Sequence, residues 1–481
     1  MGAYEVVIGL ECHVELSTRT KMFCACANVF GAEPNTNTCA VCLGHPGTLP
    51  VPNREAIARI IKIGLALGSE IAPHSVFHRK NYFYPDMPKN FQISQYDLPI
   101  CVGGSLAIEL AGGATKTVGI TRVHMEEDTG KTQHGSESGR IHDATHASID
   151  FNRAGVPLVE CVSEPDMRSP EEAAAYLREL RAILESLDVS DVKMEEGSLR
   201  CDSNVSLRPV GAGAFGTKVE IKNMNSVRSM ERALFFEIER QTAALDAGAA
   251  IVQETRHWDE DAGATKSMRS KEEAFDYRYF PEPDIPALEP DAAWIDEIRA
   301  SLPELPRARR ERYATELGLK PEVARVLVAD RGSTALFEGA LAAGADPVPA
   351  ANWVTQDVAA LRNAAGEEGS LTPGHIADVV RLIAHGTVSN AGAKQALEAS
   401  FASGEPVADA VSRLGLTQLS DTGALGALAD EVIAENPDVV QKFRDGKQGV
   451  IGFLVGQLMQ KAAGAANPKL AQELLRERLR G

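Results

Sequence analysis

The chain has 481 residues, which is long enough for two to four domains, each with its own hydrophobic core. With 44% apolar and 24% charged residues it has the composition of an ordinary globular protein, and no apolar run approaches the ~20 residues that span a bilayer. The formal net charge of -18 excludes a general nucleic-acid coat, because neutralising phosphates needs surplus Lys and Arg. We therefore expect no membrane anchor and no DNA partner, and any RNA contact must be local. No signal or transit peptide is visible, so the cytoplasm is the expected location.

The first predicted element is a β-strand over residues 4–16. Val, Ile and Tyr dominate its first half, and side chains in a strand alternate between two faces. Glu11, His13 and Glu15 share one face, while the other carries Leu10, Cys12, Val14 and Leu16. Two carboxylates and an imidazole on one face suit a hard divalent cation. An isolated E-x-H-x-E pattern is equally compatible with a solvated outer face, so both interpretations stay open at this point.

Four thiols follow on a turn-rich stretch, namely Cys24, Cys26, Cys39 and Cys42. In a reducing compartment such clustering indicates metal binding before disulfides. Paired C-x-C and C-x-x-C spacing supplies the four soft ligands of a closed, structural Zn²⁺ site. The alternative is four reduced thiols without a metal.

Residues 52–67 have apolar side chains at helical spacing, which predicts a core helix. The next segment, residues 78–86, mixes cations with aromatic residues in a loop bounded by proline. Taken alone, this segment predicts either a nucleotide-stacking loop or a packed aromatic turn.

Acidic side chains mark the next two segments. Residues 118–128 predict a strand whose side chains divide between two faces, Val123, Met125 and Glu127 on one and His124, Glu126 and Asp128 on the other. Neighbouring carboxylates repel one another unless a cation or a basic group lies near, so a metal is one physical solution. Residues 150–160 end in an apolar run closed by Glu160. A carboxylate at the end of a buried strand is costly unless it is paired, which favours a site residue.

Residues 169–222 predict a helix followed by a β-hairpin. Ser169, Pro170 and Glu172 have the types and spacing of a helix N-terminus with a capping box. Alternating polar and apolar residues over 200–208 and 218–222 predict the hairpin, whose polar face we expect to floor a cleft. The connecting loop matches G-x-G-x-x-G, but a dinucleotide fingerprint must lead from a strand into a helix, so we reject that interpretation.

The composition changes after Pro286. From about residue 292 the chain becomes rich in Ala, Leu and Glu and the strand signals largely vanish, which predicts helical domains with a second break near 402–406. From residue 441 onward the net charge becomes positive, which points to a polyanion. The glycine-rich segment 446–457 is either a turn between helices or an RNA contact.

Four runs in this chain resemble the GatB family, the B subunits of the tRNA-dependent amidotransferases; they are residues 9–15, 79–86, 124–128 and 194–202. The runs are long and unusual, and the similarity extends from the first strand to the last helix. One departure is Cys12, where the family usually has an aliphatic residue. Because Cys12 points away from the polar face, we expect little consequence.

The resemblance implies an α+β protein with three domains. Residues 1–291 would form a glutamine-synthetase-like catalytic cradle with a zinc-binding loop, residues 292–405 an all-α domain, and residues 406–481 a YqeY-like helical tail that binds tRNA, with Lys447 and Lys461 as contacts. The thiols occur in only some family members, which favours a structural clip.

The resemblance also implies a ligase. A misacylated Glu-tRNA(Gln) or Asp-tRNA(Asn) would be phosphorylated on its side-chain carboxylate by ATP and then converted to the amide with ammonia. We expect Mg²⁺ on four residues or their bound waters, namely Glu11, His13, Glu127 and Glu160. The catalytic set would be Lys80, Glu127 and Glu160, and the nucleotide set Lys80, Tyr82 and Arg200. One carboxylate could also accept the proton as ammonia attacks.

Ammonia must come from elsewhere, because the chain shows no amidase constellation. The expected partners are an A-type amidase subunit and a small C-type subunit, in a heterotrimer. Two rival functions remain: a non-catalytic tRNA-binding scaffold of the same complex, and a ligase for a free amino acid, against which the basic helical tail argues. No Walker A sequence occurs, which argues against a P-loop ATPase.

Overall fold

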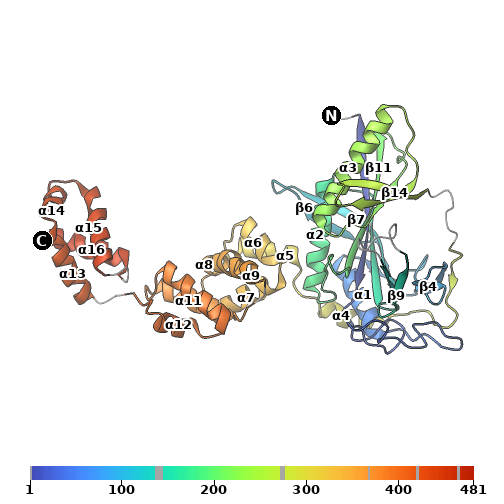
Figure 1. The fold of residues 1–481 in the computed structure, drawn as a ribbon, viewed down its shortest axis with the longest axis horizontal. Helices are drawn as coiled ribbons and strands as arrows, with labels where there is room; N and C mark the ends of the chain where they lie inside the picture. Colours follow the sequence, from blue (N-terminus) through green and yellow to red (C-terminus); the bar gives the residue numbers. More distant parts are fainter. Residues whose placement is uncertain are drawn as a thin grey trace. The chain divides into compact units, whose positions relative to one another are not determined.

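A computed structural model describes residues 3–135, 145–270, 277–366, 369–418, 422–462 and 466–480. The chain divides into two compact units, Met1–Pro306 and Arg307–Gly481 (Figure 1). Over the described residues, no helix has both the length and the apolar character needed to cross a bilayer.

The first unit is built on a 13-stranded sheet. Ten strands form its main path, in the order β14 (Ala264–Ser270), β13 (Glu254–Asp259), β12 (Val219–Lys222), β11 (Leu199–Pro209), β1 (Tyr4–Glu15), β10 (Pro157–Ser163), β7 (Thr115–Glu127), β4 (Phe91–Ser94), β3 (His78–Asn81) and β15 (Phe280–Pro281). Neighbours on this path pair antiparallel except β12 and β13, which pair parallel. Three short strands extend the sheet beside β7, namely β2 (Glu70–Ile71), β5 (Cys101–Val102) and β6 (Ser105–Glu109). A separate hairpin pairs β8 (Lys131–His134) with β9 (Ala147–Asp150).

Helices cover one face of this sheet, because that face is apolar. The predicted alternation in β1 is confirmed: Leu10, Cys12 and Val14 are buried in the core, whereas Glu11 and His13 are only half-buried. The core also takes residues from four helices, α1 (Arg54–Ala66), α2 (Pro170–Ser186), α3 (Val227–Asp246) and α4 (Ala292–Ala300). The helix predicted after Ser169 begins as expected, since the Ser169 side chain accepts a hydrogen bond from the Glu172 N–H.

The predicted hairpin is confirmed as β11 and β12, which pair with Ser203 opposite Ile221. Its glycine-rich loop therefore connects two strands and not a strand to a helix. This arrangement supports the rejection of a dinucleotide-binding site at that loop.

The second unit is helical over the described residues, as predicted from residue 292 onward. Its elements are α5 (Pro306–Thr315), α6 (Pro321–Val328), α7 (Arg331–Ala342), α8 (Pro347–Asn352), η2 (Trp353–Val358), α9 (Ala359–Ala365), α10 (Pro373–Ala384), α11 (Asn390–Ser403), α12 (Val407–Arg413), α13 (Thr422–Glu435), α14 (Pro437–Arg444), η3 (Gln448–Val450), α15 (Ile451–Lys461) and α16 (Pro468–Arg480). One core takes residues from Tyr313 to Val411, and another takes residues from Leu425 to Leu479. With the sheet in the first unit, these helices make the protein α+β.

Candidate functional site

A row of polar side chains crosses the sheet on the face away from the core. The strand register places His124 of β7 opposite Glu160 of β10, Glu160 opposite His13 of β1, and His13 opposite Arg200 of β11. Directly opposed residues in antiparallel strands have Cβ atoms ~4.5–5.5 Å apart, so neighbouring side chains along this row are in reach of one another. Four strands far apart in the chain thus contribute to one surface.

Two carboxylates and two imidazoles gather at this row. The His13 Nε2 atom lies 3.5 Å and the His124 Nε2 atom 3.2 Å from Glu160 Oε2. His124 Nε2 also lies 3.5 Å from Glu126 Oε1. One donor atom each from His13, Glu126 and Glu160 lies within 4.8 Å of the others, which is close enough to hold one metal ion. We call His13, His124, Glu126 and Glu160 the carboxylate–histidine cluster.

Side chains from β3 and β4 support Glu126. The Lys80 Nζ atom lies 3.8 Å from Glu126 Oε1. The Ser94 hydroxyl and the Gln92 amide donate hydrogen bonds of 2.7 and 3.1 Å to the same carboxylate. Lys80 is therefore adjacent to the cluster, and its ammonium lies beside the carboxylate that would hold a cation.

Charges within the cluster shift its pKa values. Burial alone would lower the pKa of His124, but the charge of Glu160 and the hydrogen bond with Glu126 raise it to about 9. Burial alone would raise the pKa of Glu126, but the Lys80 ammonium and the His124 imidazole lower it to about 2. The pKa of Glu160 lies well below its usual value, because the two histidines outweigh its burial. Both carboxylates are thus ionised near neutral pH, which is the form that binds a cation.

Glu11 stands further along the same face of β1. Its carboxylate accepts a 2.9 Å hydrogen bond from the Asn204 side chain. Burial, followed by the charge of Glu160, raises the pKa of Glu11. Glu11 is therefore within electrostatic reach of the cluster but is not one of the three close donors.

A second charged group lies beside the cluster and contains Arg200. The Arg200 guanidinium donates a 2.5 Å hydrogen bond to Asp128, and Arg153 lies 3.6 Å from the same carboxylate. Arg200 also lies 3.9 Å from Glu15. Burial and the neighbouring charge of Asp128 raise the pKa of Glu15 to about 8, so this carboxyl stays largely protonated near neutral pH.

Glu127 does not join His13 and Glu160, which corrects the metal set expected from the sequence. Its carboxylate lies on the opposite side of β7, where it pairs with the Lys89 ammonium and accepts a 2.9 Å hydrogen bond from the Ile93 N–H. There it lines a cavity of about 280 Å³. Because successive side chains of a strand point to opposite faces, Glu126 and Glu127 cannot both reach the cluster, and Glu126 does.

The Lys89–Glu127 pair predicts a stability effect. Glu127 is only 2% exposed, so Lys89→Met would leave a buried carboxylate without its partner. We expect the free energy of unfolding of the first unit to fall by about 3–5 kcal/mol, measured by urea denaturation. The double variant Lys89→Met/Glu127→Gln should recover most of that loss.

A matched control is Lys116→Met, which breaks the more open pair with Glu172. This change should lower the free energy of unfolding by no more than about 1 kcal/mol. Equal losses for the two lysine variants would show that the Lys89–Glu127 pair is not specially stabilising.

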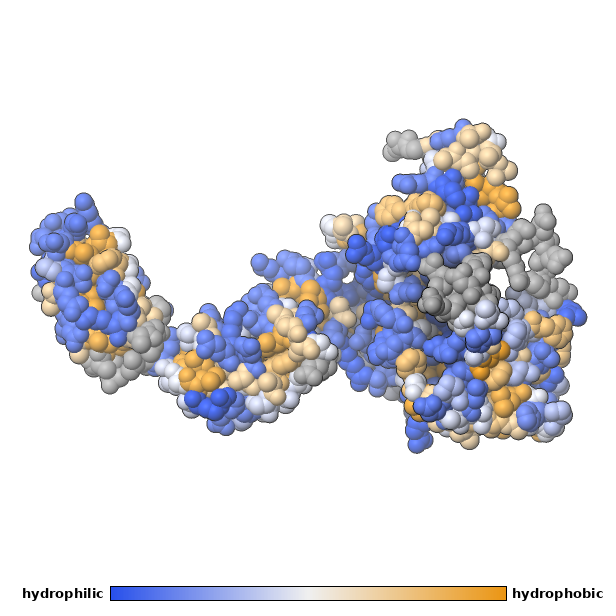
Figure 2. Space-filling model, viewed as in Figure 1, coloured by the Kyte–Doolittle hydropathy of each residue, from blue (hydrophilic) through white to orange (hydrophobic). Residues whose placement is uncertain are grey.

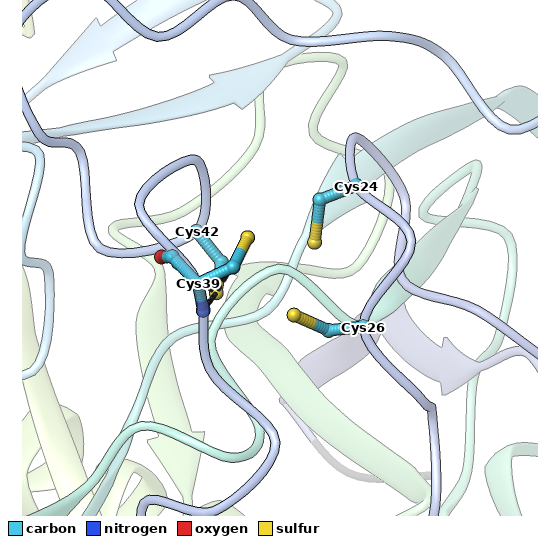
Figure 3. A group of neighbouring side chains, drawn as sticks. All are labelled: Cys24, Cys26, Cys39 and Cys42. Carbon is cyan, nitrogen blue, oxygen red and sulfur yellow. Dashed lines mark hydrogen bonds between the residues drawn. The ribbon is translucent and has the colours of Figure 1, made fainter.

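The four predicted zinc ligands come together. Figure 3 shows the sulfur atoms of Cys24, Cys26, Cys39 and Cys42 directed toward one another, and all four lie within 4.8 Å of each other. The hydrogen bond from Cys24, together with the nearby Lys21 ammonium at 3.7 Å, lowers the pKa of Cys42 to about 4. A thiolate beside three further thiols matches the soft donor set of a tetrahedral metal site.

Three further predicted residues lie outside the cluster, namely Tyr82, Lys447 and Lys461. The Tyr82 ring is 6.3 Å from the Tyr277 ring, and burial raises the pKa of its phenol above the usual range. In the second unit the Lys461 ammonium lies 3.0 Å from Glu431 and 2.7 Å from Glu435. Lys447 lies between α14 and α15 and is exposed. Figure 2 shows hydrophilic residues beside a stripe of hydrophobic ones on the visible face of the C-terminal helices.

Sequence reasoning did not place His124 and Glu126 beside His13 and Glu160. The useful signal was present, because the alternation over residues 118–128 places both on one face, opposite Glu127. Glu160 also differs from expectation, since it lies in the middle of β10 and not at a strand end. Its polar environment comes from strands on both sides, which no local pattern predicts.

Comparison with known proteins gives consistent matches along the chain. A family model described as the GatB/GatE catalytic domain matches residues 6–296, and one described as the GatB domain matches residues 335–479. A relative from Moorella thermoacetica, named as the B subunit of aspartyl/glutamyl-tRNA(Asn/Gln) amidotransferase, is 52% identical over 479 residues, covering 99% of this chain and 100% of that protein. A relative of the same name from Picosynechococcus is 52% identical and covers 99% of this chain and 98% of its own, and one from Carboxydothermus hydrogenoformans is 50% identical with 100% and 99% coverage.

Proposed function

This chain belongs to the GatB family, and from that membership we propose that it is the B subunit of an aspartyl/glutamyl-tRNA(Asn/Gln) amidotransferase. In the proposed reaction, ATP phosphorylates the side-chain carboxylate of a misacylated Glu-tRNA(Gln) or Asp-tRNA(Asn), and ammonia then displaces the phosphate to form the amide. The observation that carries this proposal is the carboxylate–histidine cluster beside Lys80.

The chemistry explains why these groups are needed. A carboxylate is a poor acyl donor, and phosphorylation gives it a good leaving group. ATP and the carboxylate are both anions, so positive charge must lie between them as they approach. We assign Mg²⁺ to His13, Glu126 and Glu160, with Glu11 in reach of its bound waters; the carboxylate oxygens suit this hard cation. The bound ion would offset the repulsion between the two anions.

Lys80 is the proposed phosphate-binding residue. Burial alone would lower its pKa, but the charges of Glu126 and the neighbouring groups raise it, so the ammonium stays charged near neutral pH. That charge can stabilise the phosphoryl group during transfer. Arg200 and Tyr82 remain proposed nucleotide contacts, Arg200 because it stands in the same cross-strand row as His13.

We propose three domains that follow the three hydrophobic cores. The first is the catalytic cradle, for which the family suggests a glutamine-synthetase-like fold; the second is helical, and the third is a YqeY-like tail that binds tRNA. The expected divisions at 291 and 405 lie close to the changes of core, although Ile298 and Val411 pack with the preceding core in each case. Lys447 is the better tRNA contact of the two predicted lysines, because Lys461 is already paired with two carboxylates.

The proposed reaction needs partners that supply ammonia. Ammonia free in water near neutral pH is mostly protonated and non-nucleophilic, which favours internal delivery within a complex. We propose an A-type amidase subunit and a small C-type subunit as partners in a heterotrimer, and a cytoplasmic location, because the product serves translation.

The test is an assay of the complex with each substrate in turn. The chain, purified with its partner subunits, is given Glu-tRNA(Gln) or Asp-tRNA(Asn) with ATP and either glutamine or ammonium. We expect amide formation on at least one tRNA, dependent on ATP. The isolated chain should show no glutamine-dependent activity, and robust glutaminase activity from this chain alone would overturn the assignment.

A further inference from the structure

Four tyrosines form a connected group at the β3–β15 end of the sheet, and we call them the tyrosine ladder: Tyr96, Tyr279, Tyr277 and Tyr82. The Tyr96 and Tyr279 rings are stacked, 4.3 Å apart and 10° from parallel. Tyr277 packs edge-on against both neighbours in the ladder, 6.1 Å from the Tyr279 ring and 6.3 Å from the Tyr82 ring.

The ladder is continuous with the carboxylate–histidine cluster. The Lys80 Nζ atom lies 5.2 Å from the centre of the Tyr277 ring and 3.8 Å from Glu126 Oε1. Tyr279 comes directly before β15, and β15 pairs with β3, the strand that carries Lys80. A ligand stacked on the ladder would therefore lie close to the cluster at which the substrate carboxylate is proposed to react.

The outer end of the ladder is open. Tyr96 is 55% exposed although it is stacked on Tyr279, and Tyr277 is 36% exposed. Burial raises the pKa of Tyr279 to about 12, so its ring is neutral near neutral pH. A packed aromatic turn would bury these rings, whereas an exposed stack leaves a flat apolar surface of the kind on which unpaired bases stack.

We propose that Tyr96, backed by Tyr279, stacks the 3′-terminal adenine of the misacylated tRNA. This inference rests on the proposed function. The terminal ribose carries the aminoacyl group, so its base must bind near the cluster that activates the side-chain carboxylate. The 3′ end of tRNA is single-stranded, and sequence-tolerant stacking on aromatic rings is a common way to hold such ends. The adenine of ATP fits this place less well, because small-molecule sites enclose most of their ligand.

The test is a double-mutant cycle on the complete complex with its partner subunits. Binding of tRNA(Gln) is measured with and without its terminal adenosine, for the wild type, Tyr96→Ala and Tyr96→Phe. We expect Tyr96→Ala to weaken binding of the complete tRNA by about 5- to 100-fold, the range for removing one stacked aromatic ring, and to leave binding of the shortened tRNA unchanged. Tyr96→Phe should bind both as the wild type does. Tyr84→Ala is the matched control, since Tyr84 is 51% exposed and stands outside the ladder.

Three outcomes would overturn the inference. If Tyr96→Ala weakened binding of the complete and the shortened tRNA equally, Tyr96 would not contact the terminal base. A raised KM for ATP with unchanged tRNA binding would assign the stack to the nucleotide. Loss of a partner protein from the Tyr96→Ala complex would make this surface an interface between subunits. Failure of the proposed function is recognised separately, because the wild-type complex would then form no amide on any tRNA.

Discussion

Glu126→Gln is expected to lower the rate of ATP-dependent carboxylate activation by about 100- to 1,000-fold, the usual effect of removing one preorganised electrostatic partner. The change removes the carboxylate charge that faces His124, Lys80 and the proposed cation. Glu127→Gln should leave this step within a few-fold of the wild type, because its side chain lies on the other face of β7. The measurement is single-turnover release of ADP from the complex with misacylated tRNA, using ammonium as the nitrogen source.

The same variants distinguish an enzyme from a scaffold. Binding of tRNA by the Glu126→Gln complex should equal that of the wild type, because the proposed tRNA contacts are Tyr96 and the tail residue Lys447 and do not include Glu126. Mn²⁺ binding can be measured by titration, with the paramagnetic signal of the ion as the readout. We expect weaker binding by Glu126→Gln and unchanged binding by Glu127→Gln. Unchanged activation in both variants would favour the scaffold, and loss only in Glu127→Gln would contradict the assignment of Glu126.

Cys26→Ser should remove one zinc ion per chain and destabilise the loop that holds the four thiols. The apparent binding free energy of structural zinc in small peptide sites is ~10–16 kcal/mol. Loss of the ion should therefore lower the free energy for opening this loop by several kcal/mol. The expected readouts are metal content, which falls from one zinc to none, and rapid proteolytic cleavage within residues 24–42. A chelator added to the wild type should reproduce the cleavage.

Cys101→Ala is the control for this experiment. Cys101 is a buried free thiol of β5 in the main core and is not one of the four clustered thiols, so its removal should leave the zinc content unchanged. The metal assignment would be contradicted if the wild-type protein, purified without chelators, contained no zinc. It would also be contradicted if the loop resisted proteolysis equally in the wild type and in Cys26→Ser.

Local patterns predicted much of the first unit. The alternation in β1 correctly separated Glu11 and His13 from Leu10, Cys12 and Val14, because the period of two is a property of any strand. Spacing predicted the four-thiol group, because C-x-C and C-x-x-C pairs on one loop can fold back on each other. The alternation of side chains over residues 118–128 also predicted that Glu126 and Glu127 face opposite sides of the sheet, although the expected metal set included Glu127.

The sequence by itself determined which side chains share a face of each strand, where helices replace strands, and which family the chain resembles. Only the tertiary structure decided that His13, His124 and Glu160 lie in one row and that Glu126 joins His13 and Glu160 in a group close enough to hold a metal ion. The physical reason is that register between strands that are distant in the chain is set by backbone pairing and by burial of the opposite face across the whole sheet. Such pairing leaves no periodic mark in either segment, so proximity of these side chains cannot be derived from one strand at a time.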